Sequence, residues 1–244
     1  MLAHGALDNA RCWARVAEAL APSYDVIAVD TRGHGRSEAP IDGYHLISQA
    51  DDLAGLVSAL RLECPALLGH SMGAEVALVL AGRYPDLLRA ILLEDPGPWW
   101  TGWPGTVEEQ VFLAAERERY AHLARQPRAT LIADRRRKRP QWTQEECEVW
   151  AEAKLQASPH AFQAFAADLD AGVDWPLILG RITCPVLLIH TDPESGGIVD
   201  QPAAAALQRM VPHLEIASIP GASHSIRRSN LARFMEVVEA FLAA

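Results

Sequence analysis

The fold is decided by the stretch Leu67-Leu68-Gly69-His70-Ser71-Met72-Gly73-Ala74. The apolar run at 65–68 predicts a buried strand, and the alanine-rich run at 74–81 predicts a helix. The Gly-x-Ser-x-Gly motif therefore lies on a tight strand-to-helix turn, which is the setting of a nucleophile elbow. Glycine on both sides of the serine removes side chains that would collide in such a turn. The turn raises the Ser71 hydroxyl above the end of the sheet and aims the Met72 N–H at an oxygen that becomes negative when Ser71 attacks.

Length and charge set the class of protein. The chain has 244 residues, which fits one large domain with room for an insertion. Its net charge of −9 argues against nucleic acid and against an anionic membrane surface as partners. No apolar run approaches a membrane-spanning length, and the first residues do not form a signal peptide. The four widely spaced cysteines indicate reduced thiols, so we expect a cytoplasmic protein without a metal site.

Strand and helix patterns alternate along most of the chain. Strands are predicted at 25–29, 65–68, 90–93, 185–190 and 214–219, and helices at 10–20, 48–60, 74–81 and 229–242. This alternation predicts a mostly parallel, doubly wound sheet with helices on both faces. Ligands bind such sheets at the carboxyl ends of the strands, where Ser71, Asp95, Asp192 and His224 are all expected.

Residues 96–180 interrupt the alternation and are predicted to form a helical lid on a core of residues 1–95 and 181–244. Helical patterns occur at 106–125, 143–157 and 159–169, and six of the seven tryptophans fall in this insertion. A lid over the strand ends would provide an apolar pocket wall, for which Trp99, Trp100, Trp103 and Leu7 are the candidates. The basic run at 135–139 is interpreted as a solvated surface of the lid, with attraction of anionic substrates as the alternative.

Ser71 needs a base and an acid to become a nucleophile. His224 is the candidate base, because it follows the last strand in a Pro-Gly-Ala-Ser-His loop that can reach the strand ends. The carboxylate that would orient this imidazole has three candidates. Asp95 ends the strand after the elbow helix, whereas Asp192 and Glu194 follow the next strand.

The pair His4-Gly5 is the candidate for the other half of an oxyanion hole. In such loops the backbone N–H of the following residue, here Ala6, faces the N–H that follows the nucleophile. Few residues precede this pair, so the strand that delivers the loop is expected to be very short.

The chain resembles the α/β-hydrolase-fold serine hydrolases. The resemblance covers His4-Gly5, residues 30–37, the elbow, residues 185–199 and residues 221–224, which is most of the core. It implies a Ser–His–acid hydrolase with a helical cap, and a sheet that lacks the first edge strands of the family. Some members place the acid after the sixth family strand, twenty-four residues beyond the nucleophile. Asp95 has that offset, so it is preferred over Glu194 and Asp192.

The expected activity is hydrolysis of a small carboxylic ester or lactone of apolar or aromatic character through an acyl-enzyme, without a cofactor. A serine at the elbow argues against the dehalogenases and epoxide hydrolases of this fold, which use an aspartate there. A carbon–carbon bond hydrolase, an acyltransferase or a slow-turnover ligand receptor would keep the same three residues. An exposed sheet edge would favour a homodimer.

Overall fold

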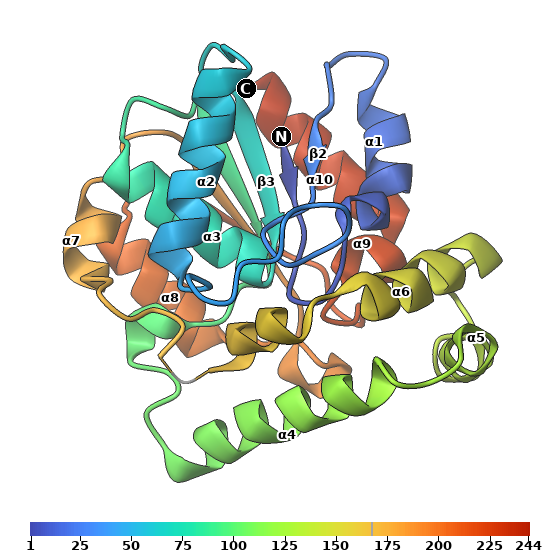
Figure 1. Cartoon of the computed structure of the whole chain (residues 1–244). Helices are drawn as coiled ribbons and strands as arrows, with labels where there is room; N and C mark the ends of the chain where they lie inside the picture. The colour runs from blue at the N-terminus through green and yellow to red at the C-terminus, as the bar shows by residue number, and fades with distance from the viewer. Residues whose placement is uncertain (167) are drawn as a thin grey trace.

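A six-stranded parallel sheet forms the centre of the computed structural model, which describes residues 1–166 and 168–244 (Figure 1). The strand order is β2-β1-β3-β4-β5-β6, and every neighbouring pair is parallel. The strands are β1 (Leu2–Ala3), β2 (Ala28–Val29), β3 (Ala66–His70), β4 (Ala90–Glu94), β5 (Val186–His190) and β6 (Leu214–Ser218). The predicted parallel α/β sheet is therefore confirmed.

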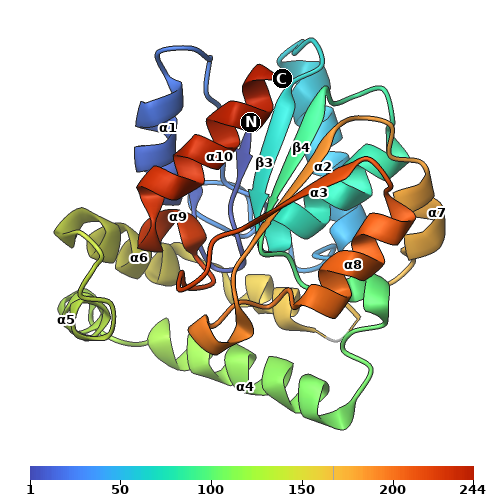
Figure 2. The same cartoon turned by 180° about the vertical axis from the view of Figure 1, so that it is seen from behind.

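Helices cover both faces of this sheet, as Figures 1 and 2 show from opposite sides. One face carries α2 (Leu46–Ala59), α3 (Met72–Arg83), α7 (Trp175–Gly180) and α8 (Gln201–Met210). The other carries α1 (Ala14–Leu20) and α10 (Leu231–Ala243), with the short α9 (Ile226–Ser229) before it. No helix in the described residues is both long and apolar enough to cross a membrane.

Alternation along the strands produces this two-sided packing. Ile91 and Leu93 of β4 belong to the apolar core on the α3 side, whereas Leu92 between them packs on the α1 and α10 side. Leu67 and Leu68 of β3 divide between the two cores in the same way. Because both faces are covered, the central strands are nearly continuous apolar runs, as parallel sheets require.

The helices of the insertion lie across the carboxyl ends of the strands. They are α4 (Val107–Leu123), α5 (Arg128–Lys138) and α6 (Gln144–Gln156), seen below the sheet in Figure 1. Capping boxes start α4 and α6, where Thr106 pairs with Glu109 and Thr143 pairs with Glu146. α7 also falls within the predicted insertion, but it packs against α3 and contributes Trp175 and Leu179 to the core.

Two segments of the insertion differ in the structure from what the sequence predicts. α5 was not predicted, because its sequence is dominated by polar and basic residues and lacks an apolar stripe. The predicted helix at 159–169 is instead a 3-10 helix, Pro159–Phe165, and residue 167 lies outside the described residues. The four cysteines are unpaired.

A buried ion pair ties the last loop to the sheet. The Arg227 guanidinium donates to Glu94 Oε2 at 2.7 Å, and the Arg227 backbone N–H donates to Glu94 Oε1 at 2.9 Å. Both side chains are almost fully buried, and the guanidinium lies 4.1 Å from the Trp13 ring centroid. Arg227 lies three residues after His224, so this pair fixes the loop that carries the candidate base.

Replacing Arg227 with methionine is expected to lower the free energy of unfolding by about 3–5 kcal/mol, because Glu94 would be left buried without its partner. Denaturant unfolding measures this change. Arg233→Met is the matched control, since its pair with Glu236 is exposed and should contribute about 1 kcal/mol or less. Equal unfolding midpoints for the two variants would contradict a stabilising role for the buried pair.

Candidate active site

Ser71 occupies a strained turn between β3 and α3. Its φ is 50°, a left-handed value that side chains other than glycine rarely adopt. The Ser71 N–H donates to Glu94 O at 2.8 Å, and the Ser71 carbonyl accepts from Ala74 and Glu75 in the first turn of α3. Strained backbone of this kind persists where surrounding contacts determine it, and it is concentrated at functional sites.

The two flanking glycines are required by close backbone approach. A Cβ on Gly69 would lie 2.3 Å from Gly73 O, and a Cβ on Gly73 would lie 2.3 Å from Ala3 O. Neither contact is possible for a real side chain. The elbow predicted from the sequence therefore has the tight geometry that its motif requires.

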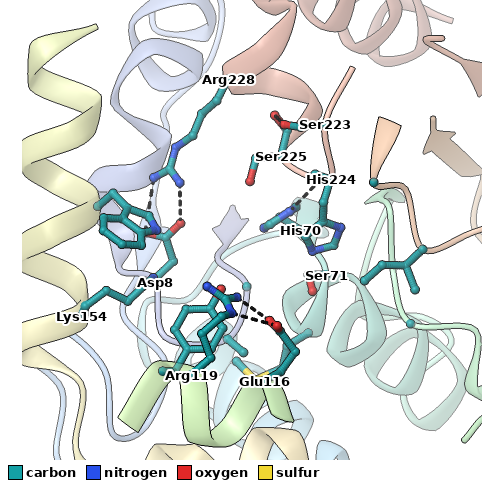
Figure 3. A pocket seen from close by; sticks show the side chains of 18 of the residues that line it. Asp8, His70, Ser71, Glu116, Arg119, Lys154, Ser223, His224, Ser225 and Arg228 are labelled. Carbon is teal, nitrogen blue, oxygen red and sulfur yellow. Dashed lines mark hydrogen bonds and ion pairs between the residues drawn. The ribbon is translucent and has the colours of Figure 1, made fainter. Parts of the chain in front are cut away.

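His224 and Asp95 form the polar pair beside Ser71. His224 Nδ1 donates to Asp95 Oδ2 at 2.7 Å, which leaves Nε2 free to accept a proton. Asp95 is fully buried and also accepts the backbone N–H groups of Ile198 at 3.0 Å and Val199 at 3.1 Å. Its φ of 46° turns it out of the end of β4. Figure 3 shows the Ser71 side chain beside the imidazole rings of His70 and His224.

The two other acid candidates lie elsewhere. Asp192 accepts the Gly221 N–H at 2.8 Å and the Ser195 hydroxyl, and these hydrogen bonds hold its pKa below the usual value. Glu194 is exposed in a short 3-10 turn. Neither side chain is among the described partners of His224, and neither lines the cavity above Ser71.

The loop that carries Ala6 is held from beneath by two buried histidines. The Leu7 N–H donates to His34 Nε2 at 3.0 Å, and the Thr31 N–H donates to His4 Nε2 at 3.1 Å. Burial lowers the pKa of both imidazoles, so both stay neutral and act as acceptors. Ala6 lines the same cavity as Ser71 and Met72, the position expected of an oxyanion-hole loop.

A cavity of about 690 Å³ opens above Ser71 and reaches beneath α4, α5 and α6. Trp99 and Trp103, two of the candidates for the pocket wall, line it with their rings 5.0 Å apart. Trp142 and Trp150, from farther along the insertion, also line it. The cavity lies where the strand ends meet the inserted helices.

Two predicted pocket residues are corrected by the structure. Trp100 faces the core instead, where its indole N–H donates to Ala203 O at 2.9 Å and its ring packs beside Trp175. Leu7 is buried against Tyr44 and Ala161, because its φ of 56° turns the side chain away from the cavity. Successive residues of a 3-10 turn point in different directions, so Trp99 and Trp100 separate.

His70 and Glu75 line the cavity although neither was predicted to do so. His70 Nε2 donates to the carbonyl of His224 at 3.1 Å, so it supports the loop of the candidate base. Glu75 accepts the Gly97 N–H at 2.8 Å, and burial raises its pKa to about 7. Its position four residues after Ser71, on the same side of the helix, is a sequence signal that could have identified it.

The cavity wall carries more positive charge than the sequence predicted. Arg135, Lys138 and Arg139, from the basic run interpreted as solvated surface, line the cavity. Lys154 of α6 and Arg228 of α9 line it as well. The wall is therefore both aromatic and cationic, rather than simply apolar.

A family model for the alpha/beta hydrolase fold matches residues 1–226, and the chain belongs to this family. It is 29% identical over 252 residues to the 2-(acetamidomethylene)succinate hydrolase of Mesorhizobium japonicum, a match covering 99% of this chain and 86% of that protein. It is 28% identical over 255 residues to the N-formylmaleamate deformylase of Pseudomonas putida, covering 99% and 87%. A crystal structure of E-2-(acetamidomethylene)succinate hydrolase gives a TM-score of 0.84 at 27% identity, covering this whole chain and 90% of that one. The protein is thus a hydrolase of the alpha/beta hydrolase fold.

Proposed function

We propose that the protein hydrolyses an ester or amide bond of a small molecule through an acyl-enzyme on Ser71. The observation that carries the proposal is the 2.7 Å hydrogen bond to the buried Asp95 carboxylate from Nδ1 of His224, which lines the cavity together with Ser71. That bond fixes the imidazole tautomer that leaves Nε2 as a base. The strained elbow places Ser71 at the wall of the same cavity.

The proposed reaction consists of acylation and deacylation of Ser71, and each of these two halves involves two proton transfers. His224 Nε2 takes the Ser71 proton as Oγ bonds to the carbonyl carbon, and the oxyanion accepts the N–H groups of Met72 and Ala6. The imidazolium then gives its proton to the departing alcohol or amine as the carbon–heteroatom bond breaks. Water, deprotonated by the same imidazole, attacks the acyl carbon; the bond from that carbon to Ser71 Oγ then breaks, and the imidazolium returns its proton to Oγ as the acid is released. Asp95 keeps its negative charge throughout and stabilises the imidazolium.

Two findings bear on the bond that is cleaved. The sequence favoured an ester or lactone, whereas the two named relatives are, by their names, a hydrolase of an acetamido compound and a deformylase of an N-formyl compound. We therefore propose that the bond cleaved is either an ester or an amide. The chemistry at Ser71 is the same for both, because only the leaving group that His224 must protonate differs.

A pair of acetyl compounds tests the proposal. 4-Nitrophenyl acetate and 4-nitroacetanilide share the acyl group and differ only in the bond that breaks. We expect steady turnover of the ester, and a slower but measurable turnover of the anilide, since its leaving group needs protonation. Release of nitrophenol and nitroaniline is followed by absorbance. No turnover of either compound would contradict the proposal.

The same assay separates the alternatives. A burst of one product equivalent without further turnover would indicate the slow-turnover receptor, and product in which an added alcohol carries the acetyl group would indicate an acyltransferase. Cleavage of carbon–carbon bonds in a vinylogous diketone, without turnover of either acetyl compound, would indicate the carbon–carbon hydrolase. A cytoplasmic location and a homodimer stay predictions from composition and from the sheet edge.

A further inference from the structure

A group of cations lines the end of the cavity opposite Ser71. Arg228 comes from α9, Lys154 from α6 and Arg135 from α5. Figure 3 shows Arg228, Asp8 and Lys154 on one side of the cavity, with Ser71 and His224 on the other. The proposed reaction at Ser71 uses none of these residues.

Two of these cations are withdrawn from solvent and Arg135 is partly buried, and the hydrogen-bonding capacity of all three is incompletely used. Arg228 is 5% exposed and Lys154 is 3% exposed. Lys154 Nζ donates to the carbonyl of Leu7, which leaves two of its three N–H bonds for other partners. Among the described residues, the buried Nε atoms of Arg228 and Arg135 have no hydrogen-bond partner. Buried polar atoms without partners are uncommon in folded proteins and call for an explanation.

Positive charge at this end exceeds negative charge. Asp8 is the carboxylate that faces the group, and it pairs with Arg228 at 3.1 Å. Burial would raise the pKa of Asp8, but Arg228, Lys154 and the nearby Arg227 outweigh burial and hold the pKa below its usual range. Two further cations of the wall are already paired, Arg119 with Glu116 and Lys138 with Asp134. One carboxylate therefore faces Arg228, Lys154 and Arg135 together.

The pKa values of two of these cations are lowered. Burial lowers the pKa of Lys154 to about 7; Asp8 opposes this lowering, and Arg228 and Arg135 add to it. Burial and the neighbouring arginines, chiefly Arg228, lower the pKa of Arg135 to about 10. A bound anion would relieve this repulsion, because it would add the missing negative charge where the dielectric constant is low.

Aromatic rings hold two of these side chains in place. The Arg135 guanidinium lies 3.5 Å from the Trp150 ring centroid, and that of Arg228 lies 4.7 Å from the Trp142 centroid. A guanidinium fixed against a ring keeps its planar fork available for an anion without losing much conformational freedom. Such a fork forms bidentate hydrogen bonds with carboxylates, as it does with phosphates.

We propose that Arg135, Lys154 and Arg228 form a carboxylate-binding subsite, so that the substrate is an acyl compound carrying a carboxylate away from the bond that breaks. The inference rests on the proposed function for the reacting end of the cavity. The subsite would bind the carboxylate under the inserted helices while the acyl carbon lies at Ser71. Trp99 and Trp103 would contact the apolar part between them.

Matched esters test the subsite through turnover. The mono-4-nitrophenyl esters of succinic, glutaric and adipic acids are compared with their methyl esters, which lack the charge, after subtraction of the uncatalysed rates. For the best-fitting chain length we expect kcat/KM to favour the anionic ester. Lys154→Met and Arg135→Gln should each reduce that preference about 10- to 100-fold, mainly through KM. Arg136→Gln, an exposed neighbour on the same helix, should leave the preference unchanged.

The ratio of the kcat/KM values of one enzyme for two substrates is insensitive to partial misfolding, since both rates depend on the same active fraction. A calorimetric titration of Ser71→Ala with glutarate tests the subsite without turnover, and dimethyl glutarate is the neutral control. Glutarate binding that is lost on adding Lys154→Met supports the subsite even if no ester is cleaved, in which case the hydrolase proposal alone fails. Equal preference for charged and neutral esters in all variants, with no glutarate binding, would overturn the subsite while leaving the hydrolase proposal intact.

Discussion

Ser71→Ala is expected to reduce kcat for ester hydrolysis by roughly 10⁴- to 10⁶-fold, with the fold unchanged. The alanine removes the hydroxyl that forms the covalent bond, and the other groups that stabilise the oxyanion stay in place. A residual rate above that of water would come from those groups and from binding. The helix α3 should be unaffected, because the Ser71 carbonyl rather than its hydroxyl accepts the first helical hydrogen bonds.

Ser225→Ala is the matched control for this variant, since Ser225 also lines the cavity and follows His224 directly. It should keep most of the activity, because Asp95 and His224 are aligned by contacts that do not involve its hydroxyl. Steady-state kinetics with 4-nitrophenyl acetate measures both variants, and thermal unfolding verifies their folding. Activity in Ser71→Ala close to that of the natural sequence would show that Ser71 is not the nucleophile.

Asp95→Asn is expected to lower kcat by about 10³- to 10⁴-fold. The amide can donate to His224 Nδ1, which would place the proton on Nε2 and remove the base that Ser71 needs. The amide also loses the charge that stabilises the imidazolium. Its oxygen can still accept from Ile198 or Val199, so the loop after β5 should stay near its position.

Glu194→Gln is the control for the acid, since this carboxylate is exposed and lies away from His224. Its kcat should change by about twofold or less, as surface substitutions usually do. The pair of variants is measured side by side with one ester across pH 5–9, so that a displaced optimum is not mistaken for a lost rate. A larger loss of kcat in Glu194→Gln than in Asp95→Asn would indicate that the acid of the triad is Glu194, in the loop after β5.

The sheet could be predicted from the sequence because its signals are local. Buried parallel strands are short apolar runs, and the elbow needs glycines at two fixed positions, so Gly69 and Gly73 identify the turn without knowledge of long-range contacts. The fold class is confirmed on this basis. The catalytic roles of Ser71, His224 and Asp95 stay predictions, although Ser71 and His224 line one cavity and the buried Asp95 is hydrogen-bonded to His224.

Features that depend on long-range packing could not be predicted in this way. Leu7 adopts a left-handed φ, and its N–H donates to His34, a residue 27 positions away. The cationic end of the cavity joins Arg228 to Lys154 and Arg135, which are distant in sequence and come from different helices. A basic run is usually a solvated surface, and it becomes part of a wall only when α5 folds across the strand ends.

The most direct test of the acyl-enzyme hypothesis is peptide mass spectrometry after treatment with diisopropyl fluorophosphate. The hypothesis predicts a single phosphoryl adduct on the peptide that contains Ser71, formed at the rate at which esterase activity is lost, and no adduct in Ser71→Ala. An adduct on another residue that persists in Ser71→Ala, or full loss of activity without an adduct on Ser71, would contradict it.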